Sequence, residues 1–243
     1  MASVTRVCMD RRLPQGLLSQ GLAIARNENP SNASTPLEAA ALTGKLWRPG
    51  RVISVQFLDG DPRLRGRVMD CWAQWGSHVN LFLDFDAGGS GDIRISFREK
   101  SSWSALGTDA LVEECFPKNS ATMNFGWLTL ESSDRELDEV VLHEFGHALG
   151  FVHEHQNPAG RLRWNREAVY RDLAKAPNYW DVEKVDRNFF AQYSGLVTNS
   201  EFDVESIMLY AIPQEWLLVG GPFASNWRLS RNDKKLAGRC YPT

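Results

Sequence analysis

The feature that most constrains this chain of 243 residues is the run HEFGHALGFVH, from His143 to His153. On a helix, residues four apart differ by about 40° around the axis, so His143 and His147 leave the same face and can share one metal ion. This is the spacing of zinc ligands. Glu144 is offset by about 100°, so its carboxylate can reach a metal-bound water without becoming a ligand. The run therefore predicts a helix with two zinc ligands and a general base.

The third histidine requires this helix to end before it. A continuous helix would rotate His153 by about 240° from His147 and carry it about 9 Å along the axis, away from the metal. Gly150 stands where the helix must stop, because glycine adopts the left-handed conformation of a helix end at the least steric cost. We therefore predict that the chain turns near Gly150 and returns His153 to the metal.

Three neutral imidazoles leave one zinc position for water, as in a catalytic site, whereas a structural site is closed by a fourth protein ligand, usually cysteine. No cysteine lies near the run in the sequence. Zinc lowers the pKa of its bound water to about 7, and Glu144 would remove the proton so that hydroxide attacks a polarised carbonyl. The predicted chemistry is hydrolysis assisted by one catalytic Zn²⁺ ion.

The run resembles the signature of the metzincin zinc metallopeptidases, and its extension through Glu154 and His155 is most similar to the astacin-like family. The segment SIMLY, Ser206 to Tyr210, resembles the Met-turn of that clan. The resemblance implies that Met208 lies beneath the histidines and that Tyr210 is a fifth ligand or a donor to the developing oxyanion. It also implies an endopeptidase with polypeptide substrates. The implied zinc ligands and catalytic residues are His143, His147, His153, Glu144 and Tyr210.

The resemblance implies an α+β metzincin (zincin-like) fold. A mixed twisted sheet and the active-site helix would form an upper lobe, above a smaller lower lobe of helices and loops. We expect residues 45–243 to be the catalytic domain, with the zinc cleft between 45–155 and 156–243. Strands are predicted at 51–58, 79–85, 92–97 and 123–127. Helices are predicted at 13–27, 62 to about 75, 164–174, 182–193 and after 229. A further helix should begin at a cap, Ser132 or Ser133, and continue through the histidine run.

Asp92 to Phe97 is the candidate for the sheet edge that lines the cleft in metzincins. An extended substrate adds to such an edge through main-chain hydrogen bonds, which leaves its scissile carbonyl over the zinc. Alternation along this segment, with Ile93 and Ile95 on one side and Arg94 on the other, supports a strand. The alternative is a strand that is paired on both sides.

Residues 1–44 are expected to form the N-terminal helix and a linker, as either a brace or an inhibitory pro-segment. Cys8 raises the possibility that its thiolate caps the zinc, as in zymogens of some metzincins. Its neighbours Val7, Met9 and Asp10 do not reproduce the familiar inhibitory pattern, so we do not expect Cys8 to be a ligand. Self-inhibition by the N-terminal segment stays open on this evidence.

The four cysteines do not fall where the disulfides of astacins would. Cys8, Cys71, Cys115 and Cys240 allow three pairings, and none forms a close metal-type pair. Cys71 lies on the apolar face of a predicted helix and is expected to be a buried free thiol. A bridge from Cys8 to Cys240 is the alternative that would join the two ends of the chain.

Composition narrows the classes of partner. A net charge of −3, a pI near 6.0 and the absence of a dense basic cluster give no reason to expect nucleic acid. No apolar run approaches the length of a membrane span, and residues 1–12 lack the apolar stretch of a secretory signal. We therefore expect a cytoplasmic protein or leaderless export.

Two alternatives to a peptidase are a zinc hydrolase of a non-peptide substrate and a zinc-retaining binding module without turnover. The intact Glu144 argues against the binding module.

Overall fold

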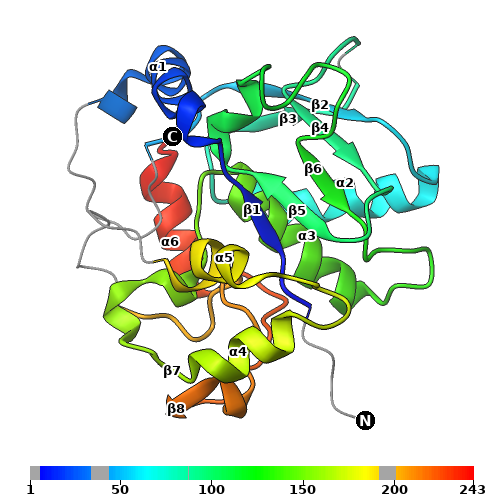
Figure 1. Ribbon diagram of the computed structural model, residues 1–243. Helices are drawn as coiled ribbons and strands as arrows, with labels where there is room; N and C mark the ends of the chain where they lie inside the picture. Colours follow the sequence, from blue (N-terminus) through cyan, green and yellow to red (C-terminus); the bar gives the residue numbers. More distant parts are fainter. Residues whose placement is uncertain (1–5, 34–43, 87, 192–200) are drawn as a thin grey trace.

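The computed structural model describes residues 6–33, 44–86, 88–191 and 201–243 (Figure 1). Within them lies a six-stranded sheet in the order β1-β5-β6-β4-β2-β3, in which only the β5–β6 pair is antiparallel. The strands are β1 (Met9–Arg11), β2 (Val52–Phe57), β3 (Phe82–Asp84), β4 (Ile93–Ser96), β5 (Ser102–Ala105) and β6 (Met123–Phe125). The predicted α+β fold with a mixed sheet is confirmed.

Two long helices fill the core behind the sheet. In α2 (Pro62–Gly76) the buried residues recur at helical spacing, and the helix packs on α3 (Asp134–Ala148). Trp75 donates its indole N–H to the carbonyl of Leu142, 2.9 Å away. Phe145 of α3 lies between the two layers, with ring centroids 5.3 Å from Trp72 and 6.4 Å from Phe125 of β6. This aromatic packing fixes the rotation of α3 about its axis and so decides where its histidines point.

A second apolar cluster forms the lower part of the molecule. It gathers α4 (Arg166–Leu173), α5 (Val182–Val185) and the short pair β7 (Arg163–Trp164) and β8 (Leu217–Val219) around Phe189 and Trp216. Tyr210 of the predicted Met-turn belongs to this cluster, whereas Met208 belongs to the upper one. The Met-turn therefore lies at the junction of the two cores.

Helix α1 (Leu18–Glu28) and the segment that follows it pack on the upper part of the molecule (Figure 1). The helix packs through Ala25, which is fully buried. Asn29 donates to the carbonyl of Trp47, 2.9 Å away, and Lys45 forms an ion pair with the buried Asp109. The boundary between residues 44 and 45 stays a prediction, and most of the expected linker, 34–43, lies outside the described residues.

Most predicted elements are confirmed within a few residues of their expected bounds. The helix expected at 182–193 is shorter, since α5 gives way to a π-helical turn at Asp186–Phe190. The end of that prediction, residues 192 and 193, lies outside the described residues. The final helix is α6 (Arg231–Cys240), which begins with a capping box between Ser230 and Asp233. No helix in the described ranges is both long and apolar enough to cross a membrane.

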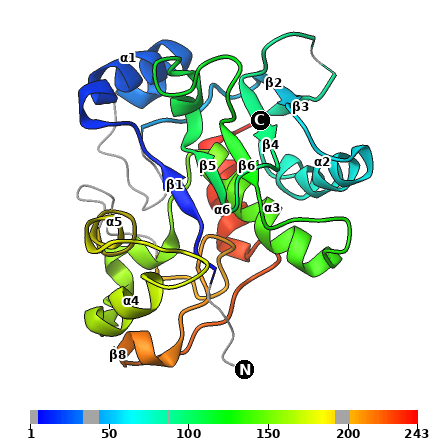
Figure 2. The same ribbon diagram turned by 45° about the vertical axis from the view of Figure 1, so that its right-hand side comes forward.

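The prediction that residues 92–97 form the sheet edge is wrong. Strand β4 pairs with β2 on one side and β6 on the other, and all four of its residues are buried. The edge on this side of the sheet belongs to β5, and β1 covers it in parallel, with Met9 opposite Trp103 (Figures 1 and 2). Alternation reports which faces of a strand are buried but does not report which strands pair.

Candidate metal centre

Helix α3 carries the first two predicted ligands and ends where the third requires it. The hydroxyl of Ser133 caps the first turn by accepting from the N–H of Glu136. At the other end, Gly150 has a φ of +92°. The N–H of Gly150 bonds the carbonyl of His147, and that of Phe151 bonds the carbonyl of Gly146. These two bonds make a Schellman ending, so the predicted turn at Gly150 is confirmed.

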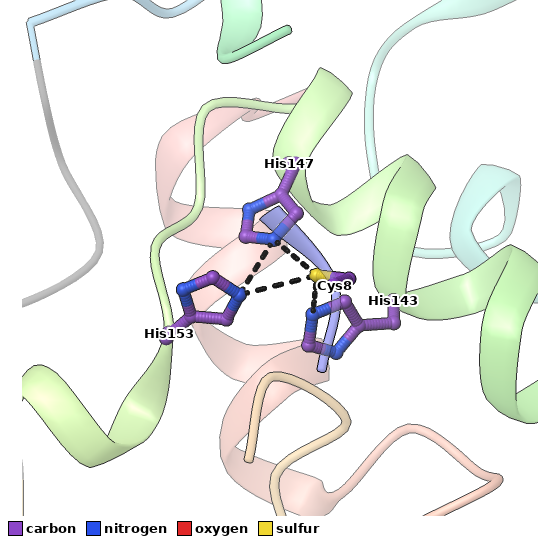
Figure 3. A group of neighbouring side chains, drawn as sticks. All are labelled: Cys8, His143, His147 and His153. Atoms are coloured by element: carbon purple, nitrogen blue, oxygen red, sulfur yellow. Dashed lines mark hydrogen bonds between the residues drawn. The ribbon is translucent and has the colours of Figure 1, made fainter. Parts of the chain in front are cut away.

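The three histidines converge with a cysteine from the other end of the sequence (Figure 3). The Sγ atom of Cys8 lies 3.0, 3.5 and 3.3 Å from the Nε2 atoms of His143, His147 and His153. The Nε2 atoms of His147 and His153 are 3.0 Å apart. All four residues are buried, and their ligand atoms lie within 4.8 Å of one another.

This donor set fits zinc. Tetrahedral zinc with Zn–N near 2.0 Å and Zn–S near 2.3 Å holds neighbouring ligand atoms roughly 3.3–3.6 Å apart, close to the separations found here. The Nδ1 atom of His143 donates to the carbonyl of Ile207, and that of His147 donates to the carbonyl of Phe151, both at 2.8 Å. These bonds place the proton on Nδ1 and leave the Nε2 lone pair for a metal.

The fourth position is the main difference from the sequence-based expectation. We expected it to be open for water because no cysteine lies near the histidine run, and we did not expect Cys8 to be a ligand. The structure instead places Cys8 beside the three imidazoles, across a separation of 135 residues. The set therefore combines the three ligands of a catalytic zinc site with the cysteine that typically closes a structural one.

Strand β1 and the residues before it hold Cys8 in place. Cys8 and Val7 are buried in the lower cluster, and the hydroxyl of Tyr210 donates to the carbonyl of Cys8 at 2.7 Å. Arg6 forms a 3.0 Å ion pair with Glu136 of α3. The same Tyr210 hydroxyl lies 2.5 Å from Nε2 of His153, which places this predicted catalytic residue at the cluster.

Met208 packs against α3, the helix that carries His143 and His147. Its thioether packs against α3 at Gly146, where an added Cβ would overlap the Met208 sulfur. The main chain on either side of Met208 also serves the site, since Ile207 accepts from His143 and the carbonyl of Met208 accepts from the N–H of Glu154. A glycine at position 146 therefore lets the Met-turn approach the ligand helix closely.

Gly146→Ala is expected to lower the free energy of unfolding by about 1–3 kcal/mol, because the added methyl overpacks the contact with Met208. Urea unfolding followed by tryptophan fluorescence measures this. Gly66→Ala in α2 is the matched control, since nothing lies within 4 Å of its added Cβ. That variant should gain about 0.5–1 kcal/mol through helix propensity. Equal effects of the two substitutions would contradict the packing argument.

Asp233 supports the Met-turn in a way that sequence reasoning missed. Its carboxylate accepts from the hydroxyl of Ser206 at 2.7 Å and from the N–H of Ile207 at 2.8 Å. Because the carbonyl of Ile207 orients His143, the start of α6 is connected to a predicted zinc ligand through two hydrogen bonds. The sequence signal was the capping box with Ser230, which predicts a helix start but not its second partner.

Glu154 and His155, the last two residues of the extended motif, are not part of the group formed by Cys8 and the three histidines. The carboxylate of Glu154 accepts from the side chain of Asn157 at 2.9 Å and from the N–H of Asp203 at 3.0 Å, and burial raises its pKa to about 7. His155 donates through Nε2 to the carbonyl of Phe189, 3.1 Å away. His155 therefore packs against the lower cluster, whereas Glu154 joins Asn157 to the chain at Asp203.

A pocket of about 200 Å³ opens beside the cluster. Glu144, which is 1% exposed, and Tyr210 line it together with Glu139 of α3. Ala211, which directly follows the Met-turn, also lines it. Burial raises the pKa of Glu139. The pocket is large enough for a side chain and lies directly next to the proposed general base.

The cysteines are all free thiols. Cys71 is buried and donates to Asp138 at 3.2 Å, which confirms the expected free thiol. The alternative of a bridge from Cys8 to Cys240 is wrong, because Cys8 lies with the histidines.

The chain is similar to known proteins in sequence and in fold. The model of the Astacin peptidase family matches residues 128–214. A solved structure of myroilysin is 37% identical, with a TM-score of 0.78 over 84% of this chain and 98% of that one. A second myroilysin structure is 36% identical, with a TM-score of 0.65 over 88% and 96%.

A more distant structure shares the fold alone. High choriolytic enzyme 1, a hatching enzyme zinc-protease from Oryzias latipes, is 14% identical, with a TM-score of 0.51 over 83% of this chain and 92% of that one. No curated protein sequence matches.

Proposed function

This chain belongs to the astacin family of zinc metalloendopeptidases, and from that premise we propose which of its residues do the work of hydrolysis. His143, His147 and His153 hold one catalytic zinc ion. The observation that carries this assignment is the convergence of their Nε2 atoms, two of them oriented by Nδ1 bonds to main-chain carbonyls. Zinc, when bound, supplies a Lewis acid for the scissile carbonyl and acidifies a water.

Glu144 is the proposed general base. It follows His143 on α3, and its side chain lines the pocket that adjoins the cluster without being one of the four ligand groups. A carboxylate in that place can take a proton from the attacking water and deliver it to the leaving amine.

Tyr210 is the proposed donor to the oxyanion. Its hydroxyl already donates to a peptide carbonyl inside the cleft, that of Cys8, at 2.7 Å. The Cys8 carbonyl therefore stands in for the carbonyl of a bound polypeptide. This contact favours hydrogen-bond donation over the alternative role of a fifth ligand.

We further propose that the N-terminal segment inhibits the enzyme. Cys8 takes the coordination position that a catalytic water needs, and β1 covers the free edge of β5, where an extended substrate would add. Ion pairs from Arg6 to Glu136 and from Arg11 to Glu99 hold the segment on both sides of Cys8. Polypeptide cleavage then requires this segment to leave the cleft.

The test is cleavage of unfolded casein by the full-length protein and by its Cys8→Ala variant, each with its zinc content measured. Activity should require bound metal. A chelator should therefore abolish cleavage, and one equivalent of zinc should restore cleavage. Stoichiometric zinc without cleavage by either protein would contradict the peptidase proposal. That result would favour a non-peptide hydrolase or a binding module.

A further inference from the structure

We propose that Glu99 and Trp103 form a subsite that selects an arginine or lysine side chain of the substrate, at a distance of a few residues from the scissile bond. This inference rests on the proposed peptidase function of the cleft. Glu99 and Trp103 together form a platform beneath β1, and a side chain of β1 now occupies it.

The present occupant of the platform is Arg11 of β1. Its guanidinium carbon lies 3.8 Å from the centroid of the Trp103 ring, and its Nη2 atom lies 2.5 Å from Oε2 of Glu99. The indole N–H of Trp103 donates to the same Glu99 oxygen at 2.9 Å. An aromatic face with a carboxylate at its edge is a site for a cationic side chain.

The platform is built by the sheet and does not depend on β1. Asn124 of β6 is fully buried and clamps the main chain of Glu99, accepting from its N–H at 3.3 Å and donating to its carbonyl at 3.1 Å. Gly126 approaches the same carbonyl so closely that an added Cβ would overlap its oxygen. Trp103 is in register with Asn124 in the β5–β6 pair. Departure of β1 would therefore expose a preformed site.

The register of β1 gives the distance of the platform from the reaction. Arg11 is three residues beyond Cys8, which marks the metal position, and an extended chain advances about 3.3 Å per residue. A substrate residue in the place of Arg11, opposite Ala105, would thus lie roughly 10 Å along the chain from the metal, with its side chain over Trp103 as that of Arg11 is. The selected residue should lie two to four positions from the scissile bond.

The chemistry predicts a preference for cations over neutral and acidic side chains. A substrate glutamine lacks the charge that both Glu99 and the ring attract, and a glutamate would be repelled by Glu99. The partial exposure of Glu99 in its ion pair, 46%, limits the effect. We expect about a tenfold higher kcat/KM for arginine than for glutamine at the selected position.

The test uses the full-length Cys8→Ala variant and peptides in which arginine, glutamine or glutamate is placed two to four residues from the cleaved bond. Adding Glu99→Gln should reduce the arginine preference from about tenfold to about twofold. The matched control is Glu113→Gln, since Glu113 is an exposed carboxylate that, like Glu99, forms an ion pair, here with Lys118 at 3.2 Å. The control should keep the full preference.

Two outcomes would overturn the subsite. One is an arginine preference that Glu99→Gln leaves unchanged. The other is faster cleavage of all peptides to the same extent, which would mean that Glu99 only anchors Arg11. Failure to cleave any peptide would instead contradict the peptidase function. In that case, binding tests the subsite independently of cleavage. The dissociation constants of the same peptides are measured by fluorescence polarisation with the full-length double variant Cys8→Ala/Glu144→Gln. Equal constants for the arginine and glutamine peptides, or no binding, would overturn it.

Discussion

Glu144→Gln is expected to lower kcat for casein and peptides by about 100- to 10,000-fold, the usual contribution of a general acid–base group. The amide has nearly the same shape as the carboxylate but cannot accept a proton from water. Glu144 is not among the four groups that converge on the metal position, so zinc should stay bound at one equivalent. The measurement is best made in the full-length Cys8→Ala background, where the cleft is expected to be accessible.

Glu131→Gln provides a control for this experiment, because Glu131 is an exposed carboxylate three residues before α3. It should leave kcat unchanged. If Glu144→Gln keeps full activity, the proton-transfer role is wrong. If it loses zinc together with activity, Glu144 supports the metal site and its part in catalysis is unproven.

Cys8→Ala in the full-length chain is expected to raise casein cleavage by about 10- to 100-fold. The cysteine lies within 3.5 Å of all three imidazole Nε2 atoms, so its removal frees the fourth position and weakens the hold on β1. This increase corresponds to a contribution of about 1.4–2.8 kcal/mol from the sulfur to the closed arrangement, since about 1.4 kcal/mol changes the competent fraction tenfold. Initial rates at equal zinc content measure the change.

Cys115→Ala is the matched control, because Cys115 is also a free thiol but lies away from the cluster. A second measurement, the absorption spectrum of the cobalt-substituted protein, does not depend on activity. Cobalt substituted for zinc should show a thiolate-to-cobalt charge-transfer band in the full-length protein and in Cys115→Ala, and the band should be absent from Cys8→Ala. A cobalt spectrum without that band in the parent protein would show that Cys8 does not bind the metal.

Local sequence patterns were enough to predict the helix that carries the site. The spacing of His143 and His147 depends only on the helical repeat, and Gly150 was required because the turn there needs a positive φ. Placing Met208 and Tyr210 depended on the resemblance to a known family, since a short Met-x-Tyr match has little meaning alone.

Sheet order could not be predicted in the same way. The alternation of residues 92–97 identified a strand correctly but could not tell that β2 and β6 would pair with it on both sides. Strand pairing depends on which segments meet in space, and the periodicity of one strand contains no information about its neighbours.

The sequence by itself therefore determined the three histidines of the proposed metal site, the neighbouring carboxylate and the turn that joins them, because these features lie within one helix and its ending. Only the tertiary structure decided that Cys8 completes the cluster and that β1 covers the edge of β5. Those contacts join residues more than ninety positions apart. They are set by the packing of the two cores and by the free main-chain groups of a sheet edge, which no local pattern specifies.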